Sequence, residues 1–296
     1  VPHELRTITQ TNYSLQGPIG RTVADAALLL AALAQRDTSS RLDPMCFPLD
    51  SSIYCDLAAV DIGSLRVGVS TDLGGVLVSK SIRKSFNERV NFLSKHVAFL
   101  SEVDVDLSDA PAVDWQLRAD VFATQYHREI DNYDVGFNPN VRSSYETALS
   151  TDVLGIAKAR RRQMELFQEV NTQFENFDVI ICPGVSVPPF KWTSLYPDKI
   201  DGRAVENYMA WLALSSALTV VGNPVTALPC GLDLNGTPFG IQCVGAMFGD
   251  HALLSNAAAI EGLFSTEPLT ARPLPDVTWL KNQKTECTTK GKEVAS

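Results

Sequence analysis

A hairpin pattern in the C-terminal third of the chain constrains the fold most. Within the stretch Asn223–Gly245, two apolar runs flank the dipeptide Asn235–Gly236. This dipeptide favours a two-residue type I′ turn, because both turn positions need positive φ. Pro224, Pro229 and Pro238 each lack a backbone donor, which confines them to strand starts, bulges or a sheet edge. The stretch therefore predicts two paired strands that contain some irregularity.

Helical and extended patterns alternate along the rest of the chain. Thr22 and Asp25 form a capping-box pattern at the start of the first helix, and Gly222 marks the end of a later one. Asp250 is expected to cap the last helix. We expect helices at residues 23–35, 80–97, 152–176, 203–220 and from 250 onward, and strands at 65–70 and 178–182. The pattern predicts an α/β fold, a mixed twisted sheet flanked by helices.

Residues 110–145 have no clear periodic pattern. Their aromatic side chains suit either core filling or the wall of a pocket, and we favour core filling. These aromatic residues are Trp115, Phe122, Tyr126, Tyr133 and Phe137.

Composition excludes several classes of protein. The 296 residues are 45% hydrophobic and carry a net charge of −9, which is typical of a soluble globular protein and argues against a nucleic-acid partner. The run Arg160–Arg162 suits a solvated helix face better than a phosphate site. We find no membrane-spanning run and no secretory signal, and the six cysteines are too scattered for a disulfide framework. We expect a cytoplasmic protein with no metal and no cofactor.

Several segments resemble the amidase signature family, and they occur in the family's order. The hairpin stretch is similar to the family's late hairpin, and Gly17–Leu30 looks like its Gly-Pro segment and the following helix. Leu65–Gly75 resembles the next strand, Asp178–Gly184 resembles the strand that ends in a Thr-Pro-Thr type loop, and Asp250–Leu254 resembles the closing helix. The resemblance covers roughly residues 10 to 270.

The family's catalytic residues have no counterpart in this chain. Amidase signature enzymes use a Ser nucleophile, a second Ser on a cis peptide bond and a Lys, all upstream of the Gly-Pro segment. Here that segment begins at Gly17, and the chain begins with Val1 instead of Met. We therefore expect residues 1–275 to be the C-terminal part of a single amidase-like domain, followed by a polar, frayed tail at 276–296. The N-terminal portion would be a partner, covalent or as a separate chain.

The resemblance also implies which residues border the substrate cleft. Cys182, Pro183 and Gly184 stand where the family has Thr-Pro-Thr, and Gly222 and Asn223 precede its late strand. Trp211, in the predicted helix before that strand, would close the cleft. Close packing at turns explains the Gly and Pro residues equally well. Ser14 stands where the family often has Asp, which leaves the identity of the small-molecule amide substrate open.

Other catalytic arrangements have weak support in the residues themselves. Ser81 and Lys84 fit the Ser-x-x-Lys spacing of serine acyl-transfer enzymes, but the companion motifs are absent. Cys182 is better interpreted as a buried inert thiol than as a nucleophile.

Two functions stay open at this point. The first is an amide hydrolase whose Ser-cisSer-Lys chemistry comes from the missing N-terminal portion, so that this chain alone is inactive. The alternative is a non-catalytic amidase-like binding or assembly subunit. Glutaminyl transfer on tRNA is less favoured, since no basic surface signal supports a tRNA partner. The sequence does not decide whether the chain forms a homodimer.

Overall fold

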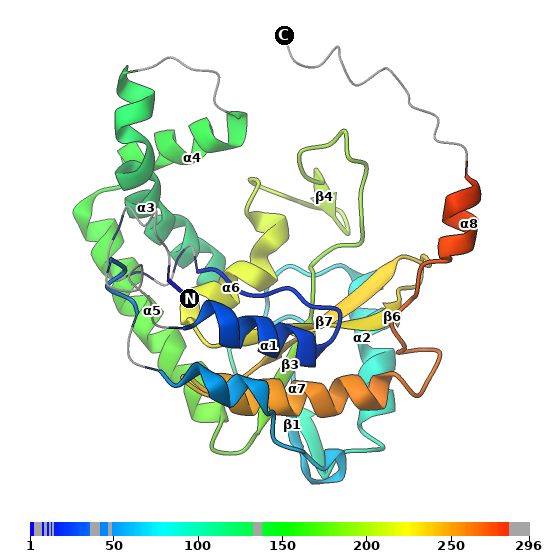
Figure 1. Cartoon of the computed structure of the whole chain (residues 1–296). Coiled ribbons are helices and arrows are strands. Elements are labelled where there is room, and N and C mark those ends of the chain that lie inside the picture. Colours follow the sequence, from blue (N-terminus) through cyan, green and yellow to red (C-terminus); the bar gives the residue numbers. More distant parts are fainter. Residues whose placement is uncertain are drawn as a thin grey trace.

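The computed structural model is an α/β assembly in which helices cover both faces of one sheet (Figure 1). The structure describes residues 1–2, 8, 11, 13, 15–35, 42–46, 49–132 and 138–283. No helix in these ranges is long and apolar enough to cross a membrane. Ser14, Tyr133 and Phe137 lie outside the described residues.

The main sheet is mixed, as the sequence predicts. Its strands lie in the order β2-β1-β3-β7-β6. The neighbours β2, β1 and β3 run parallel, whereas β7 is antiparallel to both β3 and β6. A separate two-stranded ribbon pairs β4 with β5. The strands are β1 (Arg66–Val69), β2 (Phe99–Glu102), β3 (Val179–Pro183), β4 (Lys199–Ile200), β5 (Arg203–Ala204), β6 (Val225–Leu232) and β7 (Pro238–Val244).

The helices divide between the two faces of the sheet. They are α1 (Val23–Leu33), α2 (Lys80–Leu93), α3 (Ala110–Asn132), α4 (Pro139–Ser150), α5 (Val153–Gln173), α6 (Ala213–Val221), α7 (Asp250–Phe264) and α8 (Val277–Asn282). Phe92 of α2 and Phe264 of α7 have ring centroids 6.4 Å apart, so these two helices share one face. On the other face, Ile180 of β3 and Val244 of β7 meet α5 and α6 around a small apolar cavity.

This division follows from the order of the strands. The connection from β1 through α2 to β2 moves one way across the sheet, and the connection from β2 through α3, α4 and α5 to β3 moves the other way. Right-handed crossovers in opposite directions place their helices on opposite faces. The α3–α5 arm therefore rises beside the sheet on the face away from α2 (Figure 1).

The predicted hairpin is confirmed, but its predicted turn is wrong. The connecting loop spans 233–237, and only Gly236 of the dipeptide has positive φ, at 75°. The Asp233 carboxylate accepts hydrogen bonds from Asn235 N at 2.8 Å and Thr237 N at 2.9 Å. This side chain stabilises a longer loop in place of a type I′ turn.

The proline positions follow the backbone argument. Pro224 precedes β6, Pro238 begins β7, and Pro229 lies where the β6–β7 register shifts. The shift includes Gly231, whose φ of 78° suits a bulge.

Most predicted helix boundaries are confirmed. Thr22 and Asp25 form the predicted capping box, with Asp25 N donating to Thr22 Oγ1 at 3.1 Å. Gly222 ends α6 with φ 77°, the left-handed conformation favoured after a helix. Asp250 is the first residue of α7 instead of its N-cap, which is Gly249.

Two segments differ from their predicted structure. The predicted helix 203–220 begins only at residue 213, because residues 203–204 pair as β5 and Ala210–Leu212 form a short 3-10 helix. Within the expected frayed tail, residues 277–282 form α8, capped by Asp276. The aromatic residues Trp115, Phe122 and Tyr126 of α3 are only half-buried, so the favoured core-filling interpretation is wrong for them.

Candidate functional site at the carboxyl ends of the parallel strands

The loops that follow β1 and β3 lie together at one edge of the sheet. Val69 pairs with Ile181, and Ser70 N donates to Ile181 O at 3.0 Å. Because the two strands are parallel, the segments after Val69 and after Pro183 leave the sheet side by side. Open α/β sheets bind ligands at this edge. We call it the carboxyl edge.

Cys182 is fully buried at the end of β3. Burial raises the pKa of its thiol to about 12, so the sulfur is protonated at neutral pH. Gln242 Nε2 lies 3.6 Å from Cys182 Sγ and donates to Pro183 O at 3.1 Å. This neutral thiol is a poor nucleophile, which agrees with the inert role expected from the sequence.

Pro183 and Gly184 carry the chain out of the sheet. Gly184 N donates to Gly240 O at 2.9 Å, and a Cβ on Gly184 would lie 2.8 Å from the same oxygen. Only glycine permits this close approach between the two backbones. The Ser186 carbonyl then accepts a bond from Ser79 N at 2.8 Å, which ties the loop to the start of α2.

Trp211 lies on the same side of the sheet as this loop. It packs in a small apolar cluster that includes Val187, Ile200 and Val205. Its ring meets Phe190 edge-on, with centroids 5.2 Å apart. Among the described residues, neither Trp211 Nε1 nor Ser186 Oγ has a hydrogen-bond partner, although both atoms are buried.

Gly222 and Asn223 lie at the opposite edge of the sheet. Asn223 Nδ2 donates to Gly245 O at 2.9 Å and to Asn171 Oδ1 at 3.0 Å. Gly245 follows Val244, which pairs with Ile180 near the start of β3, whereas Pro183 at the end of β3 pairs with Ile241. The structure therefore brings four of the six predicted site residues to one side and leaves these two at the other.

The Ser-x-x-Lys pair shows no catalytic geometry. Ser81 Oγ lies 3.1 Å from Ser79 Oγ, and Lys84 is exposed. Across the described ranges, no three His, Cys, Asp or Glu side chains gather as metal ligands.

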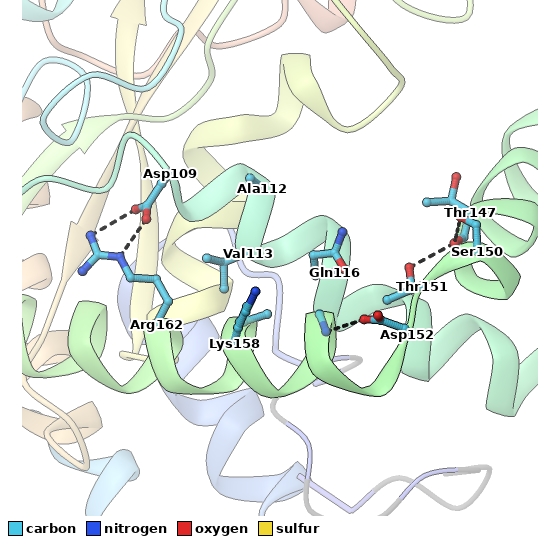
Figure 2. Close-up of a pocket in the computed structure, with 12 residues that line it drawn as sticks. Asp109, Ala112, Val113, Gln116, Thr147, Ser150, Thr151, Asp152, Lys158 and Arg162 are labelled. Atoms are coloured by element: carbon cyan, nitrogen blue, oxygen red, sulfur yellow. Dashed lines mark hydrogen bonds and ion pairs between the residues drawn. The ribbon is translucent and has the colours of Figure 1, made fainter.

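A groove of about 600 Å³ lies between α3, α4 and α5, and the sequence analysis does not predict it (Figure 2). It begins near the carboxyl edge, because a Cβ on Gly75, in the loop after β1, would lie 3.1 Å from Ser108 Cβ, next to the lining residue Asp109. Its walls combine the small residues Ala112 and Ala159 with hydroxyl, carboxylate and ammonium groups. No single sequence motif carries this groove, since it arises from the packing of three helices.

A buried carboxylate also escapes sequence analysis. Asp114 of α3 is 1% exposed, and its Oδ1 accepts a bond from Tyr13 Oη at 2.9 Å. Burial raises the pKa of Asp114 to about 6, although the Arg118 charge and the Tyr13 hydrogen bond act in the opposite direction. Its Oδ2 has no hydrogen-bond partner among the described residues.

The sequence matches the family described as Amidase over residues 2–254. The chain belongs to the amidase family. The fold agrees: a solved bacterial aryl acylamidase of the amidase signature family superposes with a TM-score of 0.73 at 20% identity, over 93% of this chain and 59% of that one.

Curated relatives carry several amide-related names. A fatty acid amide hydrolase of Medicago truncatula is 28% identical over 83% of this chain and 41% of its own length. An acylamidase of Rhodococcus erythropolis is 25% identical over 85% of this chain and 53% of its own length. One component of a glutamyl-tRNA(Gln) amidotransferase, from Lysinibacillus sphaericus, is 25% identical over 83% and 53%. The chain thus spans about half the length of the curated relatives it matches.

Proposed function

We propose that this chain is the substrate-side part of an amide hydrolase, which converts a carboxamide to a carboxylate plus ammonia or an amine. The observation that carries the proposal is the family match over residues 2–254, supported by relatives named as amide hydrolase and acylamidase. An upstream portion of the same enzyme, in the same polypeptide or as a separate one, would supply the Ser-cisSer-Lys residues.

The proposed division of labour follows from what amide hydrolysis requires. The reaction needs an activated nucleophile, a proton donor for the leaving amine, and donors that stabilise the oxyanion. The two groups that could imitate a nucleophile in this chain are poorly suited, because Cys182 is a buried neutral thiol and Ser81 has no nearby base. We therefore assign this chain a role in holding the substrate.

The proposed cleft wall lies at the carboxyl edge. Cys182, Pro183 and Gly184 form its floor, and Trp211 flanks it. The buried Ser186 Oγ and Trp211 Nε1 lack partners among the described residues, and a bound amide or the upstream portion would provide them. For Gly222 and Asn223 we propose support of β6 in place of ligand contact, because their bonds hold the start of that strand.

Strand β6 is the proposed junction with the upstream portion. It is the last strand of the sheet on its side, and Val225 and Leu232 are 38% and 44% exposed. An edge strand presents backbone donors and acceptors that a further strand can pair with.

An assay of two proteins tests the proposal. The 296-residue chain and a chain extended upstream through the expected Ser and Lys segments are given an aryl amide and a linear aliphatic amide, and amine or ammonia release is measured. We expect turnover, and labelling by a serine-reactive fluorophosphonate, only with the extended chain. Turnover by the 296-residue chain that disappears in Ser81→Ala would refute the proposal.

The same assay addresses the alternative function. One relative is named as a component of a glutamyl-tRNA(Gln) amidotransferase, so a role in an assembly has a precedent among similar proteins. An extended chain that folds but neither turns over amides nor reacts with the serine probe would favour the binding or assembly role.

A further inference from the structure

The groove between α3 and α5 has two chemically different ends and an apolar middle. Figure 2 shows α5 along one side, α3 along the other, and the end of α4 closing one extremity. At the other extremity, Arg162 donates to Asp109 through Nε at 2.7 Å and Nη2 at 3.2 Å. This ion pair satisfies both its partners, so that end requires no charge from a ligand.

The end beside α4 offers hydrogen-bond acceptors. Thr147 Oγ1 donates to Ser143 O at 2.9 Å, and the hydroxyls of Ser150 and Thr151 donate to Thr147 O at 2.8 and 3.0 Å. A hydroxyl carries one hydrogen and two lone pairs, so each of these groups has only lone pairs left to offer.

Two further oxygens join these hydroxyls. Asp152 Oδ1 accepts a bond from Gly155 N at 2.6 Å, and the ionised carboxylate can only accept. A Cβ on Gly155 would lie 3.1 Å from both Asp152 Oδ1 and Gln116 Oε1, so the glycine leaves open the space where these oxygens meet. This end therefore suits a group rich in donors, such as an ammonium.

The middle of the groove offers the opposite charge. Lys158 is exposed, extends into the groove in Figure 2, and forms no ion pair with any described residue. It follows Asp152 by six positions on α5, which separates their backbones by about 9 Å along the helix axis. Between these charges lie Ala112, Val113 and Ala159, whose side chains present only hydrocarbon.

We propose that this groove binds an ω-amino carboxylate, with its ammonium among the oxygens near Asp152 and its carboxylate on Lys158. The alkyl chain between the charges lies along Val113 and its neighbours. An α-amino acid does not satisfy both ends, because its two charges are adjacent. The site is independent of the proposed hydrolysis, since none of these residues belongs to the carboxyl-edge cleft.

Titration of the 296-residue chain by calorimetry and ligand-observed NMR tests the proposal. The probes are 6-aminohexanoate, its shorter and longer homologues, glycine, hexanoate and hexylamine. We expect 6-aminohexanoate or a near homologue to bind at least about tenfold more tightly than glycine and than either singly charged probe, because only it uses both ends. Equal binding of hexanoate or hexylamine, or no binding of any probe, would overturn the proposal.

Variants locate the site. Lys158→Gln should weaken 6-aminohexanoate binding about tenfold and leave hexylamine unaffected, since one charge-assisted contact is lost. Asp152→Asn keeps a good helix cap and should weaken binding of both amine probes. Lys191→Gln, at another exposed lysine, is the matched control and should change nothing.

A steric variant gives an independent test. Ala112 is exposed and lines the groove, so Ala112→Leu should fill it without disturbing the core, and should abolish binding while the melting temperature is kept. Unchanged affinity in both Lys158→Gln and Ala112→Leu would place the ligand elsewhere and refute the site. If Ala112→Leu does not fold, the Lys158→Gln result alone decides.

Discussion

Arg89 is the most deeply buried charge on α2, and its replacement should destabilise the fold strongly. The side chain is 2% exposed. It donates to three carbonyls outside its own helix: Cys230 O at 3.1 Å, Leu269 O at 3.2 Å and Leu232 O. Its guanidinium also lies 5.2 Å from the centre of the Phe239 ring. One side chain thus joins α2 to the irregular end of β6 and to the segment after α7.

The magnitude follows from the groups that Arg89→Met would leave behind. A buried acceptor without a partner costs about 1–3 kcal/mol, and three carbonyls lose their donor together. Partial entry of water reduces the sum, so we expect a loss of about 4 kcal/mol in the free energy of unfolding. Arg89→Lys keeps the charge but cannot reach all three carbonyls, and should lose about half as much.

Urea unfolding followed by circular dichroism measures these losses. The matched control is Arg83→Met on the same helix, where the arginine is 39% exposed and pairs with Asp72 at 2.8 Å. An exposed pair contributes about 1 kcal/mol or less. A loss below about 1 kcal/mol for Arg89→Met, or equal losses for both methionine variants, would refute the reasoning.

Three further predictions concern stability and reactivity. Burial raises the pKa of Asp114 to about 6 from its ordinary value of 3.8, so between these values the folded state binds more protons than the unfolded chain, and this carboxyl's contribution to stability falls as pH rises from about 4 to 6. Asp114→Asn should therefore be more stable than the wild type at pH 7 by about 2 kcal/mol and about equal at pH 4; urea unfolding at both values checks this, and a pH-independent difference would contradict it. Gly231→Ala should cost at least about 2 kcal/mol more than Gly236→Ala, because both have positive φ but only the first would place a Cβ 2.1 Å from Leu269 O; equal melting temperatures would count against the clash. In the native protein at pH 8, iodoacetamide should alkylate exposed Cys55 about 100-fold faster than buried Cys182, as peptide mass spectrometry can show; comparable rates would mean that β3 is open to solvent.

Local signals in the sequence predict the elements well where one residue determines the backbone. The capping box at Thr22 and the glycine at 222 each act within a single helix turn, so both boundaries are confirmed. The turn at Asn235 is wrong because a side chain just outside the dipeptide decides the loop: Asp233 accepts two backbone bonds and draws the loop out to 237. A dipeptide rule contains no information about that carboxylate.

The candidate site depends on information that no local pattern holds. Cys182 to Gly184 are correctly expected after a strand, and the parallel pairing with β1 places them at an edge typical of ligand sites. Asn223 resembles an equally suitable turn, yet the antiparallel register of β7 places it at the other edge. Sheet register, which sets the end of the sheet a turn occupies, arises from contacts between strands far apart in the sequence.

The α3–α5 groove shows the same limit for helices, and it separates two questions about function. Collinear motifs identify the family because each lies within one short segment, and the class of reaction follows from the family. The groove instead results from α3, α4 and α5 packing together, with hydroxyls that become pure acceptors only once each has donated to a main-chain carbonyl. The type of ligand it binds can therefore be inferred only from the folded chain. A result on hydrolysis and a result on amino-carboxylate binding consequently test different parts of the molecule, and either can fail without the other.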